Sequence, residues 1–382
     1  MRCLDYLSGA QMKVAEATHE TDEDMSTRVT VTGATGFVAG HVIAELLEHG
    51  YAVRATVRDL ADTGKREHLV ESARRTGGEL EFARADLNGD DGWAAAVAGS
   101  AAVLHVASPF PSTPPDDERE LIDTAVEGTL RVLRACAAAG TVRRVVLTSS
   151  TAAIVHGHPD DALRTEEDWT VIERSPAYQK SKTLAERAAW DFVAKLPAGE
   201  RFELVVVNPG MVLGPLLSAA TSTSHEPVRR LLAGDVPGTP RVGWAPVDVR
   251  DLAVAHRLAL ETPEAAGNRY ICAGEHLWMG DIARILAEEY RPRGFRVPTR
   301  RLPNWLVRGV AIFDKGVRLT VPTLGRSESL SAGKARRELG WTMRPVRETV
   351  LDTAESLLQH GIVAPPRRTQ APAAAAPRAA RV

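Results

Sequence analysis

Two hydrophobic periodicities alternate along residues 28–274. Short apolar runs rich in valine predict β-strands over 28–33, 51–58, 80–87, 101–108, 143–150, 202–210 and 268–274. Between them, apolar residues at helical spacing predict helices over 37–50, 64–75, 89–99, 119–140 and 247–261, and another that carries Tyr178 and ends near Lys195. Apolar strands that alternate with helices are typical of the α/β class, with a doubly wound parallel sheet covered on both faces. Ligands of such sheets bind beyond the carboxyl ends of the strands.

The pattern loosens after Pro215. Residues 215–245 are rich in glycine, proline and serine around a short helix at 227–234, and further helices are expected near 280–290, 304–314, 331–339 and 346–360. We therefore expect a sheet domain built from 28–214 and 246–275, and a smaller, mainly helical C-terminal lobe built from 215–245 and 276–364. Residues 1–27 are expected to be a disordered extension, with Met25 as a second candidate start, and the Pro/Ala/Arg-rich residues 365–382 a disordered tail.

Composition narrows the class of protein. Hydrophobic residues make up 44% and charged residues 25%, as in soluble globular proteins, and the formal net charge of -2 argues against nucleic acid or an anionic membrane as the main partner. No run of about 18 apolar residues predicts a membrane span, and the N-terminus lacks the apolar core of a secretory signal, so a cytoplasmic protein is expected. Cys3, Cys136 and Cys272 stand far apart, and His156 and His158 have no nearby carboxylates, so neither set predicts a metal or redox site.

The turn after the first predicted strand has the spacing of a phosphate-binding loop. Gly33 and Gly36 lie between a strand and a helix, where glycine lets the backbone approach a pyrophosphate and the helix N–H groups face the anion. Glycine serves many kinds of turn, so the position between strand and helix carries the prediction. Ala39 occupies the third small position of the pattern, which governs helix-to-strand packing.

The end of the second strand bears on which dinucleotide binds. Arg58 stands where a carboxylate would hold the ribose hydroxyls of NAD, and a guanidinium suits the 2′-phosphate of NADP. Lys65 would add a second positive charge. Both are also ordinary surface residues, and Asp59 leaves open which side chain faces the ribose, so NADP is favoured over NAD without being required.

Two further strand ends complete an expected binding rim. Asp86 could accept a hydrogen bond from the adenine amino group, with Leu87 lining the ring, and the small residues Ala107 and Ser108 leave room for a cofactor. Either pair alone is ordinary strand-end structure. Together they follow successive strand ends on one edge of the sheet, as a bound dinucleotide requires.

The predicted chemistry centres on "SPAYQKSKTLAE", residues 175–186. Tyr178 and Lys182 lie one helical turn apart and share a face. A free phenol has a pKa of about 10, and a neighbouring ammonium lowers it, which would let the tyrosine exchange a proton near neutral pH. Ser150, at the end of the fifth strand, could hydrogen-bond a substrate carbonyl oxygen. The Tyr-x-x-x-Lys spacing alone is common by chance. The glycine turn and the serine-rich strand end upstream of it favour a functional site over a packed tyrosine beside a solvated lysine.

These segments together resemble the extended short-chain dehydrogenase/reductases. "TGATGFVAG", "TSS" and "YQKSK" come in that family's order, and "VRATVRD", "HVASPF", "VLTSST" and "NPGMVLGP" are similar to its dihydroflavonol reductase-like branch of microbial aldehyde and ketone reductases. The resemblance covers about residues 28–362 and implies a Rossmann-type fold, NADP(H) as cofactor and Ser150, Tyr178 and Lys182 as the catalytic group. The cofactor-binding residues that it implies are Gly33, Thr35, Gly36, Phe37, Val38, Arg58, Lys65, Asp86, Leu87, Ala107, Ser108, Tyr178, Lys182, Pro209, Gly210 and Val212.

The expected function is NADPH-dependent reduction of an aldehyde or ketone by a monomer or homodimer, with the C-terminal lobe binding the small-molecule substrate. Phe110, Trp169, Met211 and Trp244 could line its pocket or simply join the two units. Three alternatives stay open: a nucleotide-sugar epimerase or dehydratase, which normally retains NAD; a hydroxysteroid-type dehydrogenase working in the oxidative direction; and a non-catalytic NADP-binding redox sensor. The polar substrate contacts of plant members do not map onto this chain, so a flavonoid substrate is not expected.

Overall fold

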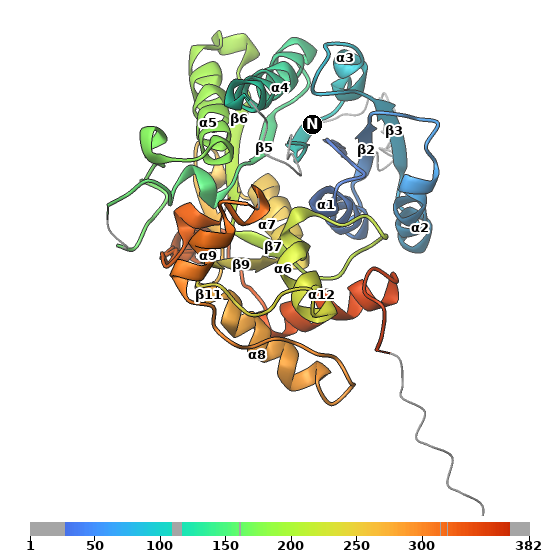
Figure 1. Ribbon diagram of the computed structural model, residues 1–382. Helices are drawn as coiled ribbons and strands as arrows, with labels where there is room; N and C mark the ends of the chain where they lie inside the picture. Colours follow the sequence, from blue (N-terminus) through green and yellow to red (C-terminus); the bar gives the residue numbers. More distant parts are fainter. Residues whose placement is uncertain (1–26, 109–116, 160–161, 314, 319, 367–382) are drawn as a thin grey trace, which may run out of the picture.

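Seven parallel strands form the central sheet of the computed structural model, which describes residues 27–108, 117–159, 162–313, 315–318 and 320–366. Their order across the sheet is β10-β6-β5-β4-β1-β2-β3. The strands are β1 (Arg28–Val31), β2 (Ala52–Val57), β3 (Leu80–Arg84), β4 (Ala102–His105), β5 (Arg144–Thr148), β6 (Glu203–Pro209) and β10 (Arg269–Cys272). The predicted Rossmann-type α/β fold is thereby confirmed, including the seventh strand (Figure 1).

Helices cover both faces of this sheet. One face carries α1 (Phe37–Glu48), α2 (Glu67–Thr76), α7 (Val249–Glu261) and α11 (Gly333–Glu338), and the other α3 (Trp93–Val97), α4 (Glu118–Ala139) and α5 (Ala177–Lys195). The fully buried Ile43 and Leu252 pack in the first apolar core, and Leu133 and Ala189 in the second. Burying these faces supplies the main driving force for the fold.

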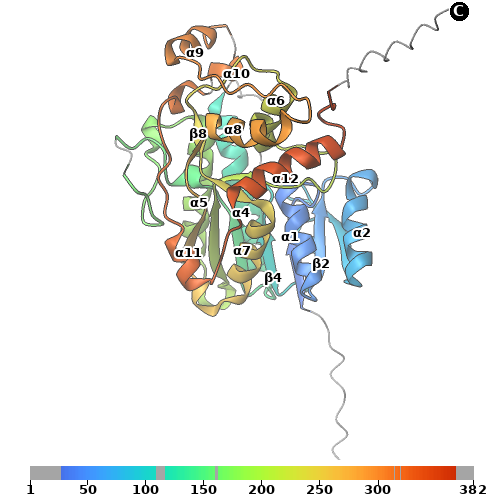
Figure 2. The same cartoon turned by 90° about the horizontal axis from the view of Figure 1, so that it is seen from below.

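The C-terminal lobe lies over the carboxyl end of the sheet (Figure 2). It contains α6 (Glu226–Ala233), α8 (Met279–Tyr290), α9 (Asn304–Val310), α10 (Lys315–Arg318) and α12 (Val346–Gln359). It also holds the strand pairs β7 (Met211–Leu213) with β9 (Pro246–Asp248) and β8 (Gly243–Trp244) with β11 (Leu277–Trp278). Its own apolar core includes Leu231, Ile282 and Leu357, all fully buried.

Three predicted helices differ in extent from those observed. The helix expected at 89–99 spans only Trp93–Val97, because Gly92 adopts a left-handed φ of 86° that ends helical geometry. The helix expected from residue 247 begins at Val249, since the preceding residues pair with β7. The helix expected at 304–314 ends at Val310.

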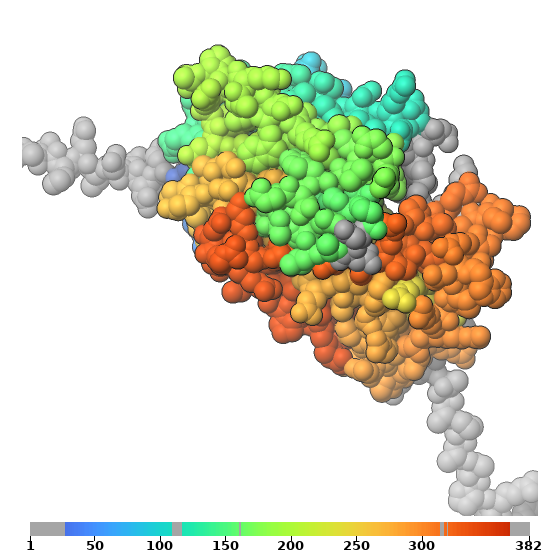
Figure 3. All heavy atoms as spheres, turned by 90° about the vertical axis from the view of Figure 1, so that its left-hand side faces the viewer, coloured from blue at the N-terminus to red at the C-terminus, as the bar shows by residue number. Residues whose placement is uncertain are grey.

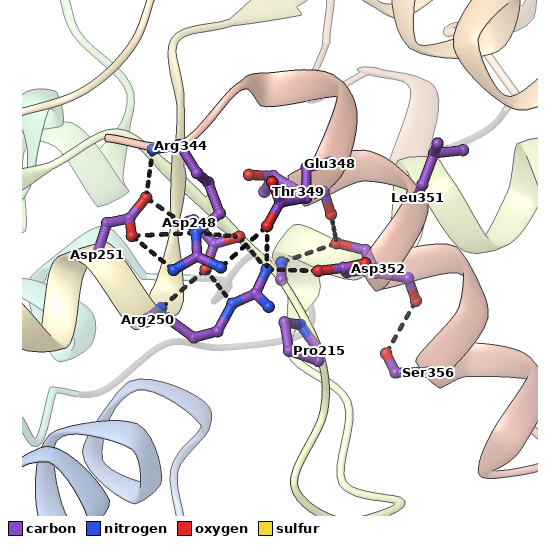
Figure 4. Close-up of polar contacts among 12 residues, drawn as sticks. Pro215, Asp248, Arg250, Asp251, Arg344, Glu348, Thr349, Leu351, Asp352 and Ser356 are labelled. Carbon is purple, nitrogen blue, oxygen red and sulfur yellow. Dashed lines mark hydrogen bonds and ion pairs between the residues drawn. The ribbon is translucent and has the colours of Figure 1, made fainter. Parts of the chain in front are cut away.

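A partly buried charge cluster joins α7 to α12 (Figure 4). The side chain of Asp248 is fully buried, caps α7 by accepting from the Arg250 N–H, and accepts two further bonds from the Arg250 guanidinium. Arg250 also donates to Asp352 of α12 at 2.6 Å. The Arg344 guanidinium donates to the Asp251 carboxylate through two nitrogens. These contacts fix the lobe against the sheet domain.

The loop after β5 contacts the lobe from the other side. Arg164 forms a parallel bridge with Leu330, and the Arg326 guanidinium donates to the His158 carbonyl at 3.1 Å. In Figure 3, the green segment after β5 lies directly against the orange C-terminal residues. The site at the strand ends is therefore enclosed by segments far apart in sequence.

Candidate active site

The glycine turn and the end of β4 are held together by one buried threonine. Thr32 Oγ1 accepts from the Ala107 N–H at 2.9 Å and hydrogen-bonds His105 Nδ1 at 2.9 Å. Gly33 has a φ of 73°, and a Cβ there would lie 2.9 Å from the Cβ of Ala107. Glycine is thus required twice at this position, by its backbone conformation and by the close approach of the neighbouring strand end.

The N-terminus of α1 suits a dinucleotide phosphate. Its N-cap, Gly36, provides no side-chain cap, and its first turn contains no acidic residue, so the N–H groups at this end are not claimed by a carboxylate. Thr35, Gly36 and Phe37 line a hollow here, and Val38 follows in the first turn of the helix. These residues fit the pyrophosphate of NADP(H).

The residues predicted to bind the adenosine half lie on the adjoining part of the rim. Arg58 follows β2 directly and is exposed, without a carboxylate partner within ion-pair distance among the described residues. Lys65 is exposed and pairs with Asp62 at 2.7 Å. Asp86 and Leu87 follow β3, and Asp86 Oδ1 accepts from the Asn88 N–H at 3.0 Å. The geometry therefore leaves Arg58 freer than Lys65 to meet a 2′-phosphate.

The three predicted catalytic residues meet at the ends of β4 and β5. The Ser150 side chain lies close enough to the Tyr178 hydroxyl to lower its pKa, and Ser150 Oγ accepts from the Ala152 N–H at 3.1 Å. One turn along α5, Lys182 Nζ donates to Ser108 Oγ at 2.9 Å. Contacts thus run from the glycine turn through the end of β4 to Lys182 of α5, and Tyr178 lies one turn away on the same helix.

The electrostatics differ from the expectation for Tyr178. Burial raises the pKa of Tyr178 to about 12, and the hydrogen bond with Ser150 only partly offsets this effect. The predicted lowering by Lys182 is wrong for this structure, because the ammonium is directed to Ser108. Burial also lowers the pKa of Lys182 to about 8, despite the opposing charge of Glu186. The pKa of the neighbouring His105 falls to about 3 through burial and the Lys182 charge, so this imidazole is neutral.

Pro209 and Gly210 lie where β6 ends. A Cβ on Gly210 would lie 1.9 Å from the Ala245 carbonyl oxygen, so the backbone here fits only glycine. Val212 is buried in β7 with its side chain in the apolar core. The close approach of the Ala245 backbone to Gly210 fixes the path of the chain after β6.

The residues proposed to line the substrate pocket lie in different parts of the molecule. The Trp169 ring packs under Arg269 at 3.8 Å and near Arg187 at 4.9 Å, so it joins segments of the sheet domain. Met211 and Trp244 pack against the lobe core. Phe110 lies outside the described residues.

Sequence reasoning missed two buried acids near this site. Glu186, one turn beyond Lys182, is fully buried and accepts bonds from β6, from β10 and from Ser149 after β5; its place on the same helical face was the available signal. Glu328 accepts from the Ala245 N–H and lies 4.0 Å from His156, and burial raises its pKa to about 7. No local pattern around Glu328 marks it, because its partners are distant in sequence.

The described residues hold neither a cluster of metal ligands nor a membrane-spanning helix. Across the described ranges, His, Cys, Asp and Glu side chains form no group of three or more suited to a metal ion. In the same part of the chain, no helix has the length and apolarity needed to span a bilayer. His158 instead bonds the Ile154 carbonyl through Nε2 at 2.9 Å.

The doubly wound sheet and the glycine turn at its first strand end are typical of proteins that bind a dinucleotide. The sequence profile of the NAD dependent epimerase/dehydratase family matches residues 29–273. Cinnamoyl-CoA reductase CAD2 of Medicago truncatula is 37% identical over 339 residues, covering 86% of this chain and 95% of the relative. Ketoreductase azaE of Aspergillus niger is 33% identical, covering 88% and 98%.

A solved structure agrees with these sequences. Yeast methylglyoxal/isovaleraldehyde reductase Gre2, complexed with NADPH, is similar with a TM-score of 0.73 and 31% identity over 88% of this chain and 99% of that one. The chain belongs to the NAD dependent epimerase/dehydratase family, within the extended short-chain dehydrogenase/reductases, as the sequence motifs indicated. It is a nicotinamide-dinucleotide-dependent oxidoreductase.

Proposed function

We propose that this oxidoreductase reduces the carbonyl group of an aldehyde or ketone to an alcohol, with Ser150, Tyr178 and Lys182 as its catalytic group. The observation that carries the proposal is the contact of Lys182 with Ser108 at 2.9 Å, beside the strand end that packs on Gly33, with Tyr178 one turn away on the same helix and next to Ser150. Relatives named as reductases of cinnamoyl-CoA and of methylglyoxal and isovaleraldehyde support the same class of reaction.

Each member of the group has a separate role. Bound NADPH supplies the hydride. The Ser150 and Tyr178 hydroxyls face one oxygen, which they hold and polarise by hydrogen bonds, and Tyr178 donates the proton that completes the alcohol. The positive charge of Lys182 stabilises the tyrosinate that remains, which offsets the effect of burial on Tyr178 once the ammonium is released from Ser108.

The protonation states in the structure agree with a reductive role. Because the pKa of Tyr178 is about 12, its hydroxyl is protonated and ready to donate at neutral pH. Because the pKa of Lys182 is about 8, its amine is mostly charged at neutral pH and loses that charge in mildly alkaline solution. At neutral pH the Tyr178 hydroxyl therefore carries the proton that the proposed reduction needs, and Lys182 is mostly charged.

The test uses the purified full-length chain. Binding of NADPH and of NADH is titrated by fluorescence, and consumption of NADPH is then followed with aldehydes, ketones and their alcohols as substrates. We expect tighter binding of NADPH than of NADH and turnover of at least one class of carbonyl compound. Tight NADPH binding with no turnover across aliphatic, aromatic and α-dicarbonyl compounds would contradict the proposed reaction and favour a redox sensor.

Assembly and location complete the proposal. We propose a monomer or homodimer in the cytoplasm; the cytoplasmic location is supported by Cys136 and Cys272, which are both free thiols buried in the apolar cores. Light scattering of the purified protein and fractionation of the source cells test these two points. A larger assembly or recovery from an oxidising compartment would contradict them.

A further inference from the structure

A buried carboxylate lies directly behind the Ser–Tyr–Lys group. Glu186 of α5 is fully buried and lies four residues beyond Lys182 on the same helical face. Its carboxylate accepts bonds from Ser149 Oγ at 2.5 Å, Asn208 Nδ2 at 2.9 Å, Arg269 Nε at 2.5 Å and, more weakly, Trp190 Nε1 at 3.4 Å. The first three donors come from β6, β10 and the residue after β5, so one acid ties three strand segments to the helix.

Two of these bonds bear on the position of Ser150. Ser149 is its immediate neighbour in the chain. The Asn208 side-chain nitrogen donates both to Glu186 and to the Ser150 carbonyl at 3.2 Å. The carboxylate therefore holds the backbone on which Ser150 is mounted, while its own helix carries Tyr178 and Lys182.

Stability alone is a poor explanation for this arrangement. The partner Arg269 is also buried, with 8% of its side chain exposed, and it donates to the carbonyls of Glu166 and Asp168 while packing on Trp169. Taking both charges out of water costs free energy that apolar side chains of similar size would not. A buried pair of this kind gives geometric definition, and here the geometry that it defines is that of the catalytic group.

We propose that Glu186 is a positioning residue of this active site, whose carboxylate sets the location of Ser150 relative to the Tyr178–Lys182 face of α5. The inference rests on the proposed function and deepens it. Lys182 faces Tyr178 and Glu186 from its own helix and His105 from β4, whereas Arg269 approaches Glu186 from β10. The Glu186 charge therefore also acts on Lys182, whose pKa it raises against the effect of burial.

The main test is Glu186→Gln, which keeps the shape and removes the charge. We expect kcat to fall about 10- to 100-fold, since small misplacements of catalytic groups have effects of this size, with the Kd for NADPH little changed. Without the neighbouring anion the pKa of Lys182 falls, so the loss of activity at alkaline pH should begin at lower pH than in the wild type. A merely structural role would not move that part of the pH profile.

A milder variant covers the case in which Glu186→Gln does not fold. Ser149→Ala removes only the bond that lies beside Ser150 and should lower kcat. The matched control is Trp190→Phe, which removes a bond to the same carboxylate from the side of the helix and should leave kcat unchanged. Wild-type kcat and an unmoved pH profile in Glu186→Gln, or wild-type kcat in Ser149→Ala, would overturn the positioning role.

A crystal structure of either variant separates this inference from the proposed reaction. A Ser150 side chain or backbone displaced relative to Tyr178 supports the positioning role whatever the substrate is. An unchanged placement of Ser150 relative to Tyr178 in the variant overturns it. A wild-type protein that reduces no carbonyl compound would instead contradict the proposed function alone.

Discussion

Lys182 Nζ lies 2.9 Å from Ser108 Oγ and thereby joins the middle of α5 to the end of β4. The contact places the only lysine on the buried face of α5, among its described residues, beside the strand end that also packs on Gly33. The proposed cofactor and catalytic residues are consequently parts of one set of contacts, and disturbing either end should affect the other.

The first prediction concerns pH. Because the pKa of Lys182 is about 8, kcat/KM for the carbonyl substrate should fall as pH rises above about 8. The measurement is NADPH consumption at limiting carbonyl substrate between pH 6 and pH 10, corrected for NADPH stability. A value that stays constant across this range would show that the charge of Lys182 is not needed.

The second prediction concerns Tyr178→Phe. Loss of the proton donor should lower kcat by about 10²- to 10⁴-fold, because this is the usual contribution of general acid catalysis. NADPH affinity should remain close to that of the wild type. Tyr51→Phe is the matched control, since Tyr51 bonds the distant Glu261 and should leave kcat unchanged. Near-normal turnover by Tyr178→Phe would remove the proposed proton donor.

The third prediction concerns cofactor choice. Arg58→Ala should weaken NADPH binding about 10- to 100-fold, which corresponds to losing one charge-assisted hydrogen bond of about 1.5–3 kcal/mol, and should leave NADH binding unchanged. Lys65→Ala should have a smaller effect, because Asp62 already holds its ammonium. Arg74→Ala, in an exposed pair with Glu71 on α2, serves as the control. Equal losses for both cofactors would place Arg58 away from the 2′-phosphate.

The fourth prediction compares two glycines. Gly33→Ala introduces both an unfavourable φ and a Cβ 2.9 Å from Ala107, so it should lower thermal stability and NADPH affinity together. Gly77→Ala has a similar φ of 69° but open space around its Cβ, so only the backbone cost of about 1–2 kcal/mol applies. Thermal unfolding with and without NADPH distinguishes them. Equal behaviour of the two variants would show that the close approach at Gly33 is unimportant.

The fifth prediction concerns the charge cluster of Figure 4. Burial acts to raise the pKa of Asp248, but hydrogen bonds from Arg250 outweigh it and hold that pKa below its usual value. Asp248→Asn removes the charge that pairs with Arg250, which keeps Asp352 as a partner, and should lower the free energy of unfolding by about 1–3 kcal/mol at pH 7. Denaturant unfolding measures this difference.

The same depressed pKa fixes how that difference depends on pH. The stabilisation by Asp248 is fully present above the carboxyl pKa of the unfolded chain, about 3.9, and is lost as pH falls through the lower folded value. The wild type and Asp248→Asn should therefore converge in stability below about pH 4. A gap that stays constant down to pH 2 would contradict the ion-pair explanation.

The order of elements was predictable because local patterns specify it. Each strand of the sheet is a short apolar run, and each intervening helix has its apolar residues on one side, so both periods can be read without knowing the fold. The pairs β7–β9 and β8–β11 were missed because they are two or three residues long and depend on segments that meet only in three dimensions. The start of α3 was not predictable from local patterns, because it depends on the left-handed φ of Gly92.

The residues predicted for the site were those whose chemistry has a fixed spacing. Tyr178 and Lys182 lie one turn apart, and the glycine turn lies between a strand and a helix. The buried acids and their cations have no such spacing. Arg269 lies inside the apolar run "NRYICAG", and a charge in a buried strand requires a buried partner. The residues near Arg269 in the sequence do not indicate that this partner is Glu186.

The last strand added to the sheet has a consequence for synthesis. β10 follows residues 215–245 of the lobe and α7 in the chain. The ribosome must therefore synthesise these segments before β10 can pair with β6 at the edge of the sheet. Until then the nascent chain presents an unpaired apolar edge of the kind that associates with other chains. Chaperones that shield such edges should therefore raise the yield of this protein more than they would for one whose sheet closes in sequence order.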